Sequence, residues 1–137
     1  MAAHLQLEIV TPEAKIYSEA VDMVTLPGVE GEMGIYPMHV PLLTQVAAGE
    51  VVALKAGQDF HLAIGEGFVQ VTGDRVAIMT DMAIRAEDID ETKAEEARKR
   101  AEARLKEKLG EEEMAAVNAA LVNSLAQLKV KRRGRGV

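Results

Sequence analysis

Short apolar runs in the first part of the chain alternate with polar residues, as in strands that bury one face. Leu5, Leu7 and Ile9 share one side of an extended segment, and polar residues occupy the other side. Comparable runs cover Val21–Leu26 and Glu50–Ala56, and turn-forming residues separate the runs about every 8–12 positions. This spacing predicts an antiparallel β-sandwich or barrel.

A β-hairpin is predicted where this region ends. Phe68–Val71 and Val76–Thr80 both alternate, and the connecting residues Thr72–Arg75 include a glycine that suits a tight turn. Helical periodicity is absent from this part of the sequence, so residues 1–86 are predicted to form a β-domain.

After residue 86 the pattern becomes helical. The segment from Glu87 to Gly110 contains no proline and no glycine before its last residue, and it is dominated by strong helix formers. Asp88 followed by Glu91 resembles a capping box, which predicts that the helix begins there. Gly110 predicts its end.

A second helix is expected to follow, with acidic residues at its start and basic residues at its end, as the helix dipole favours. Its apolar positions at helical spacing are Met114, Val117, Leu121, Leu125 and Leu128. The first helix has a smaller stripe, made of Ala94, Ala97, Ala101 and Leu105. Small residues opposite larger ones allow close antiparallel contact, so residues 87–137 are predicted to form a two-helix hairpin. The fold class is therefore α+β.

The modest stripes predict weak docking of this hairpin onto the β-domain. A hinge near Arg85–Glu87 would let the hairpin leave its seat, which is the basis of a two-state switch. A permanently packed hairpin is the alternative interpretation.

Composition and charge narrow the possible functions. The net charge is −6, which argues against a general nucleic-acid binder because such proteins need cations that neutralise phosphates. The chain has no cysteine, which excludes disulfides and thiolate zinc sites. It lacks both an apolar run of about 18 residues and the features of a signal peptide, so a cytosolic location is expected. The segment Lys129–Val137 is basic and contains no acid, and is either a solvated, frayed end or a contact for an anionic partner.

Candidate chemistry is scarce. Gly28, Gly31 and Gly34 have neither the spacing nor the following lysine of a phosphate-binding loop, and the prolines after them rule out the helix that such a loop needs. The histidines show no metal-ligand spacing, and no serine lies in a nucleophile-elbow context. No catalytic residue and no metal site are predicted, and a binding or regulatory protein is the favoured interpretation.

Two segments resemble a known family. "LPGVEGEMGIYPMHVPLLTQVAAGEV" (Leu26–Val51) resembles the signature of the ε subunit of F-type rotary ATP synthases, and "AIRAEDIDETKAEEARKRAEARL" (Ala83–Leu105) resembles that family's entry into its helical hairpin. The resemblance runs from about His4 to Arg132. It implies a β-sandwich of about ten strands followed by two helices.

The resemblance also implies partners. The sandwich would bind the γ subunit and sit on the c-subunit ring, and the hairpin would reach the α and β subunits when it extends, blocking ATP hydrolysis. The basic end Lys129–Arg135 would then meet acidic surfaces of the catalytic head. Gly28, Gly31 and Gly34 would form a tight edge. Glu30 and Glu32 would face the ring, and His39 and Thr44 would approach γ or the ring. The residues assigned to partner binding are Gly28, Glu30, Gly31, Glu32, Gly34, His39 and Thr44.

The resemblance further implies a nucleotide site, because ATP binds the folded hairpin in some bacterial members of the family. The matching residues here are Ile89, Asp90, Lys93, Ala94 and Arg100. Lys93 stands where the motif has arginine, and the second helix has no arginine before Lys129. Lysine keeps the charge but loses the bidentate fork, so ATP binding is expected to be weak or absent and no cofactor is expected.

The function that follows from the resemblance is a non-catalytic rotor subunit that couples proton translocation to ATP synthesis and restrains hydrolysis. It would be peripheral, held by the complex at the cytoplasmic face of a bacterial inner membrane, or at a thylakoid membrane if the source is a plastid. A free-standing ATP-sensing or adaptor protein of the same fold is the alternative.

Overall fold

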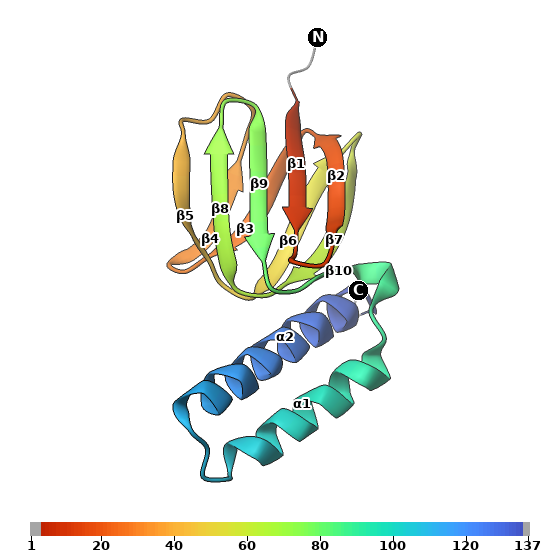
Figure 1. The fold of residues 1–137 in the computed structure, drawn as a ribbon. Helices are drawn as coiled ribbons and strands as arrows, with labels where there is room; N and C mark the ends of the chain where they lie inside the picture. Colours follow the sequence, from red (N-terminus) through yellow and green to blue (C-terminus); the bar gives the residue numbers. More distant parts are fainter. Residues whose placement is uncertain (1–3, 136–137) are drawn as a thin grey trace.

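The computed structural model describes residues 4–135, and side chains as far as Arg133; Val137, at the end of the basic segment, lies outside the described residues. Ten strands precede a short 3-10 helix and two α-helices in this part of the chain (Figure 1). The strands are β1 (Leu5–Val10), β2 (Lys15–Val21), β3 (Met23–Gly28), β4 (Gly31–Ile35), β5 (Leu42–Val46), β6 (Gly49–Lys55), β7 (Gln58–Ile64), β8 (Gly67–Thr72), β9 (Arg75–Thr80) and β10 (Ala83–Arg85). The helices are η1 (Ala86–Asp88), α1 (Glu91–Leu105) and α2 (Glu111–Arg135).

The strands form a sandwich of two layers. One layer has the order β5-β8-β9-β1-β2, and the other has β4-β3-β6-β7-β10 (Figure 1). The layers are joined through β3 and β5 by one pair of residues, Gly28 and Val46. Pairing is antiparallel except between β1 and β9, which run parallel. The predicted sandwich and the predicted final hairpin, β8–β9, are confirmed.

The core lies between the layers and follows from the alternation in the sequence. Leu5, Leu7 and Ile9 are fully buried, as expected from their shared face. The larger members of the core from the other strands are Tyr17, Val21, Val24, Leu26, Ile35, Val46, Val51, Leu62, Ile64, Val69, Val71, Val76 and Ile78. Because the buried set comes from nearly every strand, the sandwich has a core independent of the helices.

Polar contacts join β2 of one layer to β6 and β10 of the other layer. Lys55 on β6 donates a hydrogen bond to the Glu19 carboxylate on β2, and this bond raises the pKa of Lys55. Arg85, the last residue of β10, donates to the carbonyl of Ile16 at 3.3 Å and lies 5.0 Å from the centre of the Tyr17 ring. Arg85 is thus anchored to the sandwich, so the hinge predicted near Arg85–Glu87 would have to lie after this residue.

The helices form the predicted antiparallel hairpin, with α2 between the sandwich and α1 (Figure 1). The small stripe of α1 is confirmed, since Ala94 and Ala101 are buried. Two details of the prediction were wrong. Leu125 is 45% exposed because it lies between the face of α2 toward α1 and the face toward the sandwich. The cap of α1 is Asp90, whose side chain accepts from the Lys93 backbone N–H at 3.1 Å, and not Asp88, which belongs to η1.

Two further expectations from the sequence need correction. Val21–Leu26 is not one strand: the chain bends at Asp22, where β2 ends and β3 turns to the other layer. The basic segment is not a frayed end over its described part, because α2 continues to Arg135 and the side chains of Lys131, Arg132 and Arg133 have partners.

Candidate functional site

The turn between β3 and β4 carries the first group of residues assigned to partner binding. Gly31 has φ +132°, and a Cβ on Gly28 would lie 2.7 Å from the Gly31 carbonyl oxygen, so the turn depends on both glycines. Glu30 and Glu32 are exposed there. The turn therefore presents two carboxylates on a short, constrained edge.

The remaining assigned residues do not join this turn. Gly34 lies further along β4, and His39 belongs to the loop at the opposite end of that strand, where its Nδ1 lies 2.7 Å from the Val40 carbonyl oxygen. Thr44 pairs with the buried Val69 and is half-buried on the inward side of β5. The assigned residues are thus spread from the β3–β4 turn along β4 and β5 to the β4–β5 loop, and a partner that contacts all of them must span the length of β4.

An exposed apolar surface along β5 was not anticipated from the sequence. We call it the β5 surface: Val29, Tyr36, Met38, Val40, Leu43 and Phe68, all exposed. Val29 and Phe68 border the same shallow groove, and Leu43 lies on the outward side of β5. Large apolar residues gathered on one edge are typical of an interaction site. Their position could have been recognised, because three of them flank Pro37 and Pro41 in a segment without alternation.

The backbone of the β4–β5 loop is strained at the centre of this surface. Met38 has φ +66°, which is unusual for a residue with a side chain, and its side chain is the most exposed of the surface at 85%. Strain of this kind gathers at binding sites, where the fold holds a side chain in place for a partner.

The residues matching the nucleotide motif have structural roles in this chain. Asp90 caps α1, and Ile89 and Ala94 are buried at the start of the hairpin. Lys93 and Arg100 are both exposed on α1. The structure does not bring these five residues into one pocket.

A groove between α1 and the end of α2 is lined by three acidic and two basic side chains, together with Thr92. Arg132 of α2 bridges Glu91 and Glu95 of α1, at 2.8 Å to each carboxylate. Glu95 accepts hydrogen bonds from Arg98 and Arg132. These bonds, the one from Arg98 more strongly, hold the pKa of Glu95 below its usual value. A lowered carboxylate pKa stabilises the hairpin at neutral pH, and this contribution is lost as the pH falls through that pKa. Arg132 therefore joins the two helices through these carboxylates.

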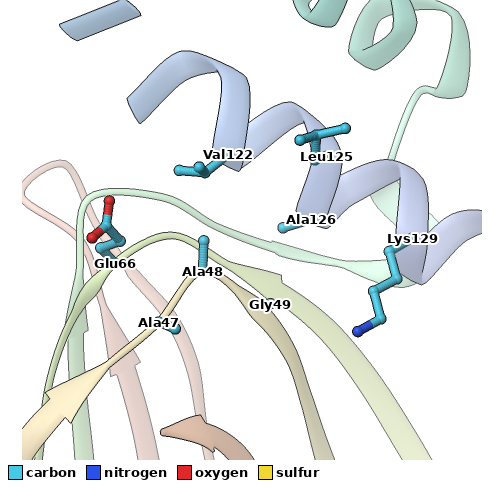
Figure 2. Close-up of a pocket in the computed structure, with 8 residues that line it drawn as sticks. All are labelled: Ala47, Ala48, Gly49, Glu66, Val122, Leu125, Ala126 and Lys129. Atoms are coloured by element: carbon cyan, nitrogen blue, oxygen red, sulfur yellow. The ribbon is translucent and has the colours of Figure 1, made fainter. Parts of the chain in front are cut away.

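The interface between α2 and the sandwich is small and incompletely filled. Its buried apolar residues are Ala63, Ile89, Ala126 and Val130, and the partly buried Ala48, Met82, Ile84 and Ala86 pack against them. Beside it lies an open groove of about 410 Å³, where Ala48 and Gly49 face Leu125 and Ala126 (Figure 2). Small side chains each bury little apolar area, which favours the weak docking predicted from the sequence.

Among residues 4–135 there is no helix long and apolar enough to cross a membrane. The same part of the chain shows no group of three potential metal ligands.

Comparison with known proteins adds the decisive observation. Residues 4–86 match the family described as ATP synthase, Delta/Epsilon chain, beta-sandwich domain, and residues 87–132 match its long alpha-helix domain. The chain belongs to the ATP synthase δ/ε chain family. The resemblance found in the sequence is thereby confirmed, and as a member of this family the chain is a non-catalytic subunit of ATP synthase.

Relatives named ATP synthase epsilon chain match almost end to end. That of Dehalococcoides mccartyi (strain CBDB1) is 44% identical over 134 residues, which cover 97% of this chain and 96% of the relative. That of Herpetosiphon aurantiacus is 44% identical over 131 residues, 96% of each chain. Among solved structures, a chain of the Euglena gracilis mitochondrial ATP synthase OSCP/F1/c-ring assembly matches with a TM-score of 0.74 and 27% identity, covering 93% of this chain and 80% of that one.

Proposed function

We propose that this chain is the ε subunit of the central rotor stalk, which binds the γ subunit and the c ring and couples proton translocation to ATP synthesis. The observation that carries the proposal is the β5 surface. The chain that bears this surface belongs to the ATP synthase δ/ε chain family, and its structural relative belongs to an F1/c-ring assembly. Exposed apolar residues on one edge suit a permanent subunit contact. The acidic β3–β4 turn suits the polar loops of the ring. The chain is then peripheral, at the cytoplasmic face of a bacterial membrane or at a thylakoid membrane.

We further propose that the hairpin restrains ATP hydrolysis by leaving the sandwich and extending toward the α and β subunits. Two features support this: the small side chains in the apolar cluster under α2, and the anchoring of Arg85 to the sandwich, which leaves the chain after it to act as a hinge. An interface of this size allows the docked and undocked states to differ by only a few kcal/mol, as a two-state element requires.

Deletion of residues 111–137 tests both proposals. We expect the shortened chain to co-purify with γ as the full chain does, because the sandwich has its own core. ATP hydrolysis by the assembled complex should rise severalfold, with proton-coupled synthesis retained. The controls are complexes with the full chain and complexes without this subunit. If the full chain fails to bind γ, a free-standing adaptor is favoured; unchanged hydrolysis contradicts the regulatory role.

ATP binding to the hairpin is expected to be weak. Arg132 is held by two carboxylates, and Asp90 is used as a helix cap, so the planar phosphate recognition of an arginine pair is lacking among the described residues. We expect a Kd above about 1 mM, corresponding to about −4 kcal/mol or weaker. Isothermal titration with MgATP measures it, and Lys93→Arg should recover little. Micromolar binding would refute this expectation.

A further inference from the structure

Three consecutive basic residues near the end of α2 have three different acceptors. Lys131 donates to the Ala86 carbonyl at 3.3 Å, Arg132 binds α1, and Arg133 binds Glu50 on β6. Successive side chains of a helix point about 100° apart, so these three residues contact η1, α1 and the sandwich at the same time. Among these contacts, the Arg133–Glu50 pair is the one that joins charged side chains of the hairpin and the sandwich.

Glu50 is a buried acid near the start of β6. It faces outward from β6, away from the core residue Val51, and only 6% of its side chain remains exposed beneath α2. Oε1 accepts from Arg133, and Oε2 lies 2.9 Å from Nδ1 of His61 on β7. His61 therefore orients the carboxylate within the sandwich and leaves its other oxygen for the hairpin.

We propose that Arg133 and Glu50 form a latch that selects the docked hairpin. A carboxylate covered by α2 is costly unless a cation pairs with it, whereas undocking returns both groups to water. The regulatory consequence rests on the function proposed above: the basic end, which the sequence assigned to contacts of the extended state, stabilises the docked state instead. Loss of Arg133 then increases inhibition.

The burial of the two partners makes the effects of their substitutions unequal. Arg133→Gln leaves the Glu50 carboxylate covered and without its cation, so it penalises docking. Glu50→Gln leaves Arg133, whose side chain is 61% exposed, in contact with water and removes the buried charge, so it changes docking little. In the double variant that combines Glu50→Gln with Arg133→Gln, the arginine substitution should have almost no further effect on docking.

The docking equilibrium can be measured in the full isolated chain, which has no cysteine of its own. Ala63→Cys places a thiol under α2, and Ala53→Cys places one in the sandwich core. Under conditions where opening is fast, the labelling rate of each thiol reports the population of the open state. The first reports undocking of the hairpin, and the second reports unfolding of the sandwich.

We expect Arg133→Gln to raise the labelling rate at position 63 about tenfold and to leave the rate at position 53 unchanged. Arg132→Gln is the matched control, because it removes the neighbouring arginine that binds α1, and it should change the rate at position 63 less than about threefold. Equal effects of the two arginine substitutions would overturn the latch. So would a full effect of Arg133→Gln in the Glu50→Gln background.

ATP hydrolysis by the assembled complex separates the latch from the proposed regulation. With Arg133→Gln, hydrolysis should fall relative to the complex with the unmodified chain. A changed labelling rate with unchanged hydrolysis establishes the latch and contradicts the regulatory function. An unchanged labelling rate overturns the latch, whatever the hydrolysis assay shows.

Discussion

Leu43→Asp should weaken binding of the γ subunit at least about 100-fold, corresponding to about 3 kcal/mol, while the sandwich stays folded. Leu43 is 67% exposed and is the member of the β5 surface that lies on β5 itself, so the substitution places a charge where we propose an apolar partner. Because the side chain points outward from β5, the free energy of unfolding should change by no more than about 1 kcal/mol. Surface plasmon resonance with immobilised γ measures the affinity, and chemical denaturation measures the stability.

Phe60→Asp is the matched control for this substitution. Phe60 is an exposed apolar residue on β7, in the other layer of the sandwich and away from the β5 surface. Phe60→Asp should leave the affinity for γ within about threefold of the affinity of the unmodified chain. If both substitutions weaken binding equally, γ does not select the β5 surface, and the proposed docking site is wrong.

Gly67→Ala should lower the melting temperature of the chain by at least about 10 °C. A Cβ on Gly67 would lie 1.9 Å from the Met79 carbonyl oxygen and 2.9 Å from the Thr80 Cα, both in the backbone of the paired strand β9. Backbone atoms cannot rotate away as a side chain does, so β8 and β9 must separate and lose ladder hydrogen bonds. We expect a loss of about 3 kcal/mol or more in the free energy of unfolding.

Gly34→Ala provides the comparison in another strand. The nearest atom to a Cβ there is the Met23 Cε at 3.6 Å, an ordinary contact with a flexible side chain. This substitution should be neutral or slightly stabilising, because alanine reduces the freedom of the unfolded chain. Differential scanning calorimetry of the two variants measures the contrast, and similar melting temperatures would show that the close approach at Gly67 is relieved at little cost.

The residues that sequence patterns located best are those whose role depends on neighbours along the chain. Leu5, Leu7 and Ile9 alternate and are buried, and the small stripe of α1 packs against α2 as its spacing predicted. Boundaries were less well predicted at Asp22 and Asp88. A bend between strands and the choice of a helix cap depend on tertiary contacts that compete with local preference.

For the interaction residues, the sequence located a segment and the tertiary structure changed its meaning. The signature Leu26–Val51 contains both the acidic turn and His39, but β4 separates them to opposite ends of the sandwich. Thr44 faces inward on β5, and its exposed neighbour Leu43 was not selected. The register of β5 against β8 decides which of two adjacent residues faces outward, and a motif contains no register.

The sequence by itself determined the family, the sandwich and the hairpin, because alternation, helical periodicity and a long motif are local properties of the chain. Only the tertiary structure decided what the basic end of α2 does. Arg133 and Glu50 are 83 residues apart, and no local pattern relates them. Burial beneath α2 makes the carboxylate dependent on the arginine, and burial is a property of the packed molecule rather than of either segment.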